Sequence, residues 1–162
     1  TTYLQAGLSG PIVGVLTAAA AFINILGNYG AGQLLYRGVR AQHLLYAGFI
    51  VMSLGTYLTF GSLAANWFPV RYMAVLAFSA IGGMIPTALF SLSVHLAPNE
   101  KTISTTVGWM QQWSSFGQFC GAPVVAVVAA AVGGWQYTWT VTLLLSVMGI
   151  LLSSHAAIRK TF

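Results

Sequence analysis

Long apolar stretches separated by short polar breaks run through the whole chain. Each holds about 20 residues or more, which is enough for a helix to cross a hydrocarbon core of roughly 30 Å. The pattern predicts an all-α integral membrane protein. Its five transmembrane helices are expected at about residues 8–35, 44–63, 70–96, 102–132 and 137–157. Residues 1–162 are therefore treated as one transmembrane bundle, with no soluble domain, linker or low-complexity segment.

The fourth stretch carries a polar stripe in an otherwise apolar sequence. At about 100° per residue, six of its polar and small residues fall on one face of a helix, and Trp109, Trp113 and Phe116 lie nearly opposite. The stripe consists of Ser104, Gly108, Gln111, Ser115, Gln118 and Ala122. Amides inside a bilayer are costly unless they meet water, a solute or a partner helix. We therefore predict that Gln111, Ser115 and Gln118 line a substrate cavity.

The first and third stretches also have a small or polar face, whereas the second and fifth are plain. Asn24 and Asn28 share a face of the first stretch, and Ser79 belongs to the polar side of the third. These residues complete the candidate substrate-binding set, although hydrogen bonding between helices explains the two asparagines equally well. Gly82-Gly83 with Pro86 favours a kink or close helix packing over a break in the third helix.

Composition places the chain in a membrane. Hydrophobic residues make up 57% of the chain and charged residues only 4%, against roughly 25% charged residues in soluble domains. A net charge of +5 would suggest nucleic acid as the partner of a soluble protein. Here the basic residues flank apolar stretches, so they indicate orientation, and no nucleic-acid partner is expected.

The basic residues fall mainly on one side of the predicted topology. Five of them share a side and only Arg71 lies opposite; the five are Arg37, Arg40, Lys101, Arg159 and Lys160. The positive-inside rule then puts the C-terminus in the cytoplasm. Trp67, Trp135 and Trp139 collect at the opposite ends, where indole rings favour the membrane interface.

Several classes of chemistry lack the residues they need. Cys120 is the only cysteine, so a disulfide within the chain and a multi-thiolate metal site are excluded. No Asp, Glu, Lys or Arg lies in the middle of a predicted span, and no cluster of His, Asp and Glu suggests an enzyme. We expect no enzyme activity, no cofactor and no metal. The single acid, Glu100, is expected in the loop before the fourth helix. The chain begins without Met or a leader, as an excised fragment would.

One loop carries a family resemblance. The residues from Gly32 to Arg40 read Gly-Gln-Leu-Leu-Tyr-Arg-Gly-Val-Arg and resemble the signature loop of the major facilitator superfamily, Gly-x-Leu-x-Asp-Arg-x-Gly-Arg. Gly32, Leu34, Arg37 and Arg40 match, while Tyr36 replaces the acid. The stretch from Pro98 to Trp135 is similar to the eleventh helix of bacterial members.

The resemblance covers the chain as helices eight to twelve, most of the C-terminal six-helix bundle of a twelve-helix transporter. It implies secondary active transport of a small solute by alternating access, in a bacterial cytoplasmic (inner) membrane. The implied partners are the solute, membrane lipid and an N-terminal half, with Gly32, Arg37 and Arg40 in a gating cytoplasmic loop. Three-helix repeats would make the second and fifth helices peripheral. A channel or scaffold assembled from copies of a five-helix unit is the alternative.

Overall fold

Helices account for all the regular structure in the described residues, 7–61 and 67–154, of the computed structural model. They are α1 (Gly10–Tyr36), α2 (Ala41–Phe60), α3 (Phe68–Leu96), a 3-10 turn η2 (Glu100–Thr102), α4 (Ile103–Ala131) and α5 (Trp139–Ser153). α1 to α4 thus begin and end close to the bounds expected for the first four apolar stretches. Four helices are long and apolar enough to cross a membrane, so the chain has the features of an integral membrane protein.

The fifth predicted span is shorter in the described chain than the sequence suggested. α5 has 15 residues, which at a rise of 1.5 Å per residue is about 22 Å and less than a hydrocarbon core of roughly 30 Å. The remainder of that predicted span, from residue 155, lies outside the described residues. In the described residues, four helices are long enough to cross a membrane, and the fifth is a short apolar helix.

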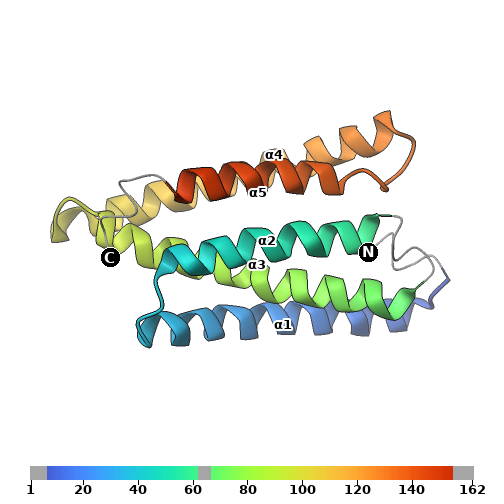
Figure 1. Ribbon diagram of the computed structural model, residues 1–162, viewed down its shortest axis with the longest axis horizontal. Helices are drawn as coiled ribbons and strands as arrows, with labels where there is room; N and C mark the ends of the chain where they lie inside the picture. Colours follow the sequence, from blue (N-terminus) through green and yellow to red (C-terminus); the bar gives the residue numbers. More distant parts are fainter. Residues whose placement is uncertain (1–6, 62–66, 155–162) are drawn as a thin grey trace.

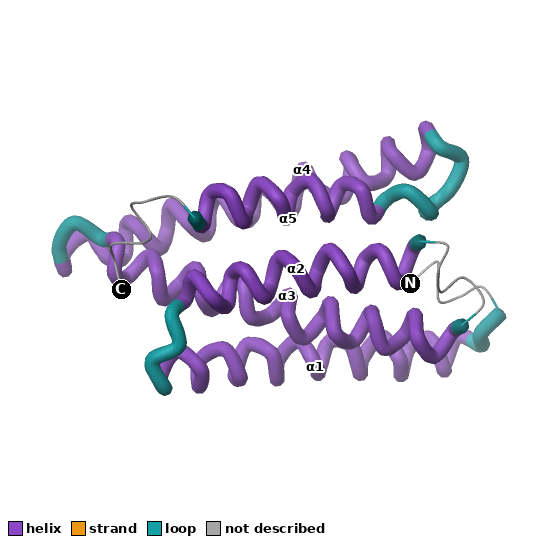
Figure 2. The backbone as a smooth tube through the Cα atoms, in the orientation of Figure 1, coloured by secondary structure: helices purple, strands orange, loops and turns teal. Residues whose placement is uncertain are grey.

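α3 is the central helix of the bundle (Figure 1). It packs against α1, α2 and α4, while α5 packs against α2. Tyr72 reaches Leu16 near one end of the α1–α3 contact, and Thr87 reaches Asn28 further along both helices. Because these pairs advance together, α1 and α3 are parallel. α2 runs in the opposite direction and packs on another side of α3 from α1 (Figure 1). Figure 2 shows that the short connections all lie at the ends of the bundle.

The alternating directions bring three basic residues to one end. Arg37 and Arg40 flank the α1–α2 connection, and Lys101 lies in the α3–α4 connection at the same end (Figure 1). Arg71, in the first turn of α3, lies at the other end, as do the tryptophans at 67, 135 and 139. The predicted grouping is confirmed for these residues, whereas Arg159 and Lys160 lie outside the described part of the chain.

A glycine with a positive φ angle forms the α1–α2 connection. Gly38 has φ 85°, and its N–H donates to Leu35 O at 2.9 Å while Val39 donates to Leu34 O at 3.0 Å. These crossed bonds form a Schellman motif, which needs a left-handed residue and therefore favours glycine. Gly133, with φ 69°, ends α4 with the same arrangement.

Glu100 lies directly before α4, where we expected it, but it does not cap the turn. Asn99 accepts a hydrogen bond from the N–H of Thr102 at 3.1 Å, and the N–H of Asn99 donates to the Thr102 hydroxyl at 3.2 Å. This reciprocal pair is a capping box. Glu100 is exposed beside it, so the residue that fixes the start of this segment is Asn99.

Arg71 joins the two helices at the opposite end. Its Nε and Nη2 both donate to the backbone carbonyl of Thr59, at 3.0 and 2.9 Å. Thr59 is in the last turn of α2, where carbonyls lack helical partners and the helix end is partly negative. The guanidinium therefore ties the start of α3 to the end of α2.

The buried core lies nearer the end that carries Arg37 and Arg40. It is made by α1, α2 and α3, through Ala31, Ala41, Leu44, Leu45, Ala88 and Leu92. The small residues let the three backbones approach, and the leucines fill the space between them. The fold is thus best packed where the α1–α2 connection is tight.

α2 is more closely packed within this chain than was expected of a peripheral helix. Its most apolar window is 33% buried, against at most 17% in the other three long helices. Two glycines of α2 explain this: Gly48 faces Ile85, and Gly55 faces Phe78, both in α3. α5 covers another side of α2 through Gly149, which lies against the Phe49 ring. α5 itself fits the prediction, since most of its leucines are exposed.

Candidate functional site

Polar side chains join α1 to α3 along their shared length. The Asn24 amide donates to Ser79 O at 2.8 Å, and the Ser79 hydroxyl donates to Ala20 O at 2.6 Å. Further along, the Thr87 hydroxyl donates to Asn28 Oδ1 at 2.8 Å. We call this set of interhelical bonds the α1–α3 seam. Such bonds satisfy polar groups that would otherwise lie unpaired in lipid.

Two glycines allow the backbones of the seam to meet. A Cβ atom on Gly27 would collide with the backbone carbonyl of Ala80. One on Gly83 would collide with the backbone carbonyl of Asn24 and would lie 2.8 Å from Nδ2 of Asn28. α3 stays helical through Pro86, so the Gly82-Gly83 pair does not break the helix, and Gly83 is the member of the pair that serves close packing.

Asn24, Asn28 and Ser79 therefore lie in the contact between α1 and α3, as expected if their role is hydrogen bonding between helices. Asn28 also donates to Asn24 Oδ1 at 3.3 Å, one turn away in α1. Each of the three residues is partly buried and uses its polar atoms on protein partners. A role in binding a substrate stays a prediction for all three.

The polar stripe of α4 is in a different situation. Gln111, Ser115 and Gln118 are exposed. Their side chains make only long contacts within α4: Gln111 to Ser115 at 3.5 Å and Gln118 to Ser114 at 3.4 Å. α4 packs against α3 and the adjoining turn, and no extended contact joins it to α1. The structure thus does not bring the asparagines and the stripe into one cavity.

The aromatic face of α4 forms a shallow groove of about 290 Å³. Trp109, Gln112, Trp113 and Phe116 line it, and the Trp113 and Phe116 rings meet edge to face with centroids 6.1 Å apart. Its aromatic residues were predicted to lie nearly opposite the stripe. Gln112 was not predicted as a site residue, because one amide among aromatic rings gives no periodic signal.

The predicted gating residues surround the α1–α2 connection. Gly32, Arg37 and Arg40 are exposed, with Arg37 following the last residue of α1 and Arg40 preceding the first of α2. The residue that shapes the connection is Gly38, which was not assigned a role. A glycine two positions past the last helical residue was the available signal. Gating by this loop stays a prediction.

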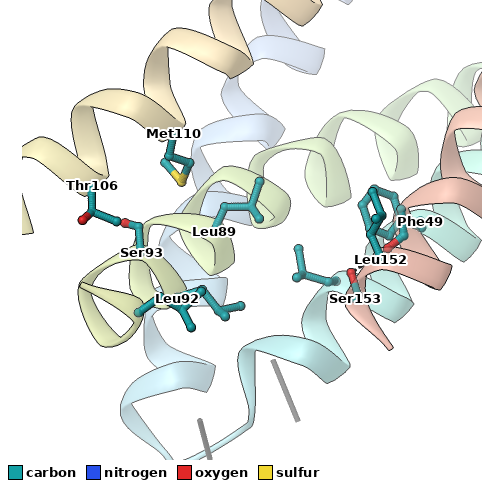
Figure 3. Close-up of a pocket in the computed structure, with 11 residues that line it drawn as sticks. Phe49, Leu89, Leu92, Ser93, Thr106, Met110, Leu152 and Ser153 are labelled. Atoms are coloured by element: carbon teal, nitrogen blue, oxygen red, sulfur yellow. Dashed lines mark hydrogen bonds between the residues drawn. The ribbon is translucent and has the colours of Figure 1, made fainter. Parts of the chain in front are cut away.

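A second cavity lies between α2, α3, α4 and α5 and was not foreseen from the sequence (Figure 3). Its volume is about 350 Å³. Leu45 and Phe49 of α2 and Leu89 and Leu92 of α3 form one part of its wall, and side chains of α4 and α5 face them across the gap (Figure 3). It draws residues from four helices, so no single helical pattern reveals it. We call it the four-helix cavity.

Within residues 7–61 and 67–154, no three His, Cys, Asp or Glu side chains gather where they could hold a metal ion. Comparison with known proteins adds no assignment. No protein family, curated protein or solved structure matches this chain. The features that bear on function are therefore the arrangement of the helices and the exposed polar stripe of α4.

Proposed function

We propose that this chain forms part of a secondary active transporter of the major facilitator type, which moves a small solute by alternating access. The observation that carries the proposal is the exposed polar stripe of α4, Gln111, Ser115 and Gln118, in a helix of membrane length. The order of the helices and the Gly32–Arg40 loop support the same assignment. The N-terminal half of the transporter would face the stripe across the solute pathway.

The stripe would lie deep in the membrane, where amide groups need polar partners. α4 has 29 residues, so at 1.5 Å per residue it is about 43 Å long. Gln111 and Gln118 lie about 12 and 22 Å from its start, well inside a hydrocarbon core of roughly 30 Å. Primary amides at that depth require water, a solute or protein partners. In the described chain their only partners are weak bonds along α4 itself.

The proposed orientation follows the basic residues. Arg37, Arg40 and Lys101 would face the cytoplasm, because Lys and Arg accumulate on that side of membrane proteins. The tryptophans at the other end would lie at the opposite interface. A bacterial inner membrane is the proposed location, with the α1–α2 connection acting at the cytoplasmic gate.

The experiment tests whether the stripe meets water in the assembled protein. In a Cys120→Ala background, Ser115→Cys and Phe116→Cys are compared for reaction with a charged, membrane-impermeant thiol reagent in lipid nanodiscs. The two positions are adjacent, so their depths match, but they lie on different faces of α4. We expect Ser115→Cys to react at least tenfold faster, because a charged reagent does not enter lipid. Equal rates, or faster labelling of Phe116→Cys, would refute a polar pathway along the stripe.

The same variant can identify the solute. A transported compound should slow labelling of Ser115→Cys, and its uptake into proteoliposomes should fall in Gln118→Leu. Gln112→Leu is the matched control, since it removes the same amide from the aromatic groove and should leave uptake unchanged. If oxidation instead joins Ser115→Cys between two copies in a stable oligomer, and no compound protects it, the scaffold or channel alternative is favoured over a transporter.

A further inference from the structure

The four-helix cavity is open on one side, between α4 and α5. α2 packs on α3, α3 packs on α4 and α2 packs on α5, but no extended contact joins α4 to α5. The cavity therefore has α2 and α3 as its floor, α4 and α5 as its walls, and an open side between the walls. Figure 3 shows Met110 and Thr106 of α4 across the gap from Leu152 and Ser153 of α5.

The chemistry of the lining excludes a polar guest. Neither an amide nor a charged group lines the cavity, and its three hydroxyl groups already donate within their own helices. These bonds run from Ser93 to Phe90 O at 2.8 Å, from Thr106 to Thr102 O at 3.0 Å, and from Ser153 to Gly149 O at 2.7 Å. A buried water needs two to four polar partners, which this lining does not offer.

A volume of about 350 Å³ is within the roughly 300–1,000 Å³ of ligand sites and far above the roughly 30 Å³ of a water molecule. An empty space of that size would deprive its lining of dispersion contacts. In a bilayer, the apolar molecule that reaches a lateral opening between two helices is a lipid, through its acyl chain.

The cavity also lies at the basic end of the bundle. Two residues of the lining follow a basic residue closely in the sequence: Leu45 comes five residues after Arg40, and Thr106 comes five residues after Lys101. At 1.5 Å per residue, each cation is about 8 Å along the helix axis from the cavity lining. The chain has six Lys and Arg residues and one carboxylate side chain. The single carboxylate can neutralise at most one of these cations, and the net charge is +5. Basic groups beside cavities between transmembrane helices favour anionic lipid headgroups.

We propose that the four-helix cavity binds one acyl chain of an anionic phospholipid, whose headgroup is held by Arg40 and Lys101. The lipid enters between α4 and α5 and fills the space that these helices leave open. This site is separate from the polar stripe and does not depend on transport; it requires only that the helices lie in a membrane containing anionic lipid.

The test uses nanodiscs that hold either phosphatidylglycerol or phosphatidylcholine with a photoactivatable group at the end of an acyl chain. We expect phosphatidylglycerol to crosslink to residues of the cavity, identified by peptide mass spectrometry. Leu152→Trp fills the cavity from an exposed position and should reduce that crosslinking at least fivefold. Leu144→Trp is the matched control on the same helix, because the two leucines are 66% and 67% exposed and only Leu152 lines the cavity.

A second arm tests the headgroup. Arg40→Gln and Lys101→Gln should each lower the preference for phosphatidylglycerol over phosphatidylcholine about fivefold, and Lys101→Arg should retain it. Thermal melts of every variant show whether the fold is intact. Equal crosslinking by both lipids, no effect of Leu152→Trp, or crosslinks outside the cavity would each overturn the proposal. A polypeptide segment of the assembled protein found in the cavity in place of lipid would overturn it as well.

Discussion

The close approach of α1 and α3 predicts that Gly27→Ala destabilises the bundle. The added methyl group would meet backbone and not a movable side chain, since the carbonyl carbon of Ala80 would lie 2.6 Å from it. Ordinary contact needs 3.4–4 Å and the carbonyl oxygen would lie closer still than the carbon, so the two helices would have to separate by more than about 1 Å. A separation of that size stretches the neighbouring hydrogen bonds of the seam beyond the range in which they hold.

The expected cost can be worked from these contacts. The bonds of Asn24, Ser79 and Thr87 across the seam are worth about 0.6 kcal/mol each in a bilayer, or about 2 kcal/mol together. Overpacking adds about 1–3 kcal/mol, and the better helix propensity of Ala returns about 1 kcal/mol. We therefore expect a net loss of about 2–4 kcal/mol in the free energy of unfolding.

The assay is reversible unfolding by titration with a denaturing detergent, followed by circular dichroism, with thermal melts as a second readout. Gly30→Ala is the matched control in the same helix, because nothing lies within 4 Å of a Cβ atom there. It should be neutral or up to about 1 kcal/mol more stable. If Gly27→Ala unfolds at the same detergent fraction as Gly30→Ala, backbone contact is not what holds α1 against α3.

Three smaller effects follow from the helix ends, all measurable by the same unfolding assay. Gly38→Ala should cost about 1–2 kcal/mol, because its φ of 85° is strained for a residue with a Cβ atom; an unchanged midpoint would contradict the Schellman connection. Arg71→Gln should cost about 1–2 kcal/mol by weakening the bonds to Thr59 O, with Arg71→Lys intermediate. Asn99→Ala should cost about 1 kcal/mol, whereas Glu100→Gln should be close to neutral; the reverse order would show that the acid is the cap.

Helix positions were predictable from the sequence because apolar length is a local property. Runs of apolar residues gave bounds close to those of α1 to α4, and the position of each charge at a helix end followed. Hydroxyl and amide periodicity also identified the polar face of α4, although its aromatic face is exposed as well. These inferences need no knowledge of neighbours, since each depends only on the spacing of residues within one helix.

Neighbour relations were less predictable. Periodicity places Asn24 on a face of α1 but does not say that this face meets Ser79 of α3. The plain leucine-rich composition of α2 suggested exposure to lipid, yet Gly48 and Gly55 let α3 pack closely along it. In a bilayer, lipid tails and leucines are equally apolar, so hydrophobicity alone does not separate an inner helix from an outer one.

The α1–α3 seam also has a consequence for the order of membrane insertion. Its partners are 55–59 residues apart in the sequence, so α1 enters the bilayer before the residues that will bond to it have been synthesised. At about 5–20 residues per second, the asparagines of α1 wait roughly 3–12 s for α3. During that interval Asn28 can donate to Asn24 within the helix, as it does at 3.3 Å in the folded chain. Replacing Asn28 with leucine would leave the Asn24 side chain without this hydrogen bond until α3 is inserted. We expect the variant to insert less efficiently and to give a lower yield of protein in the membrane.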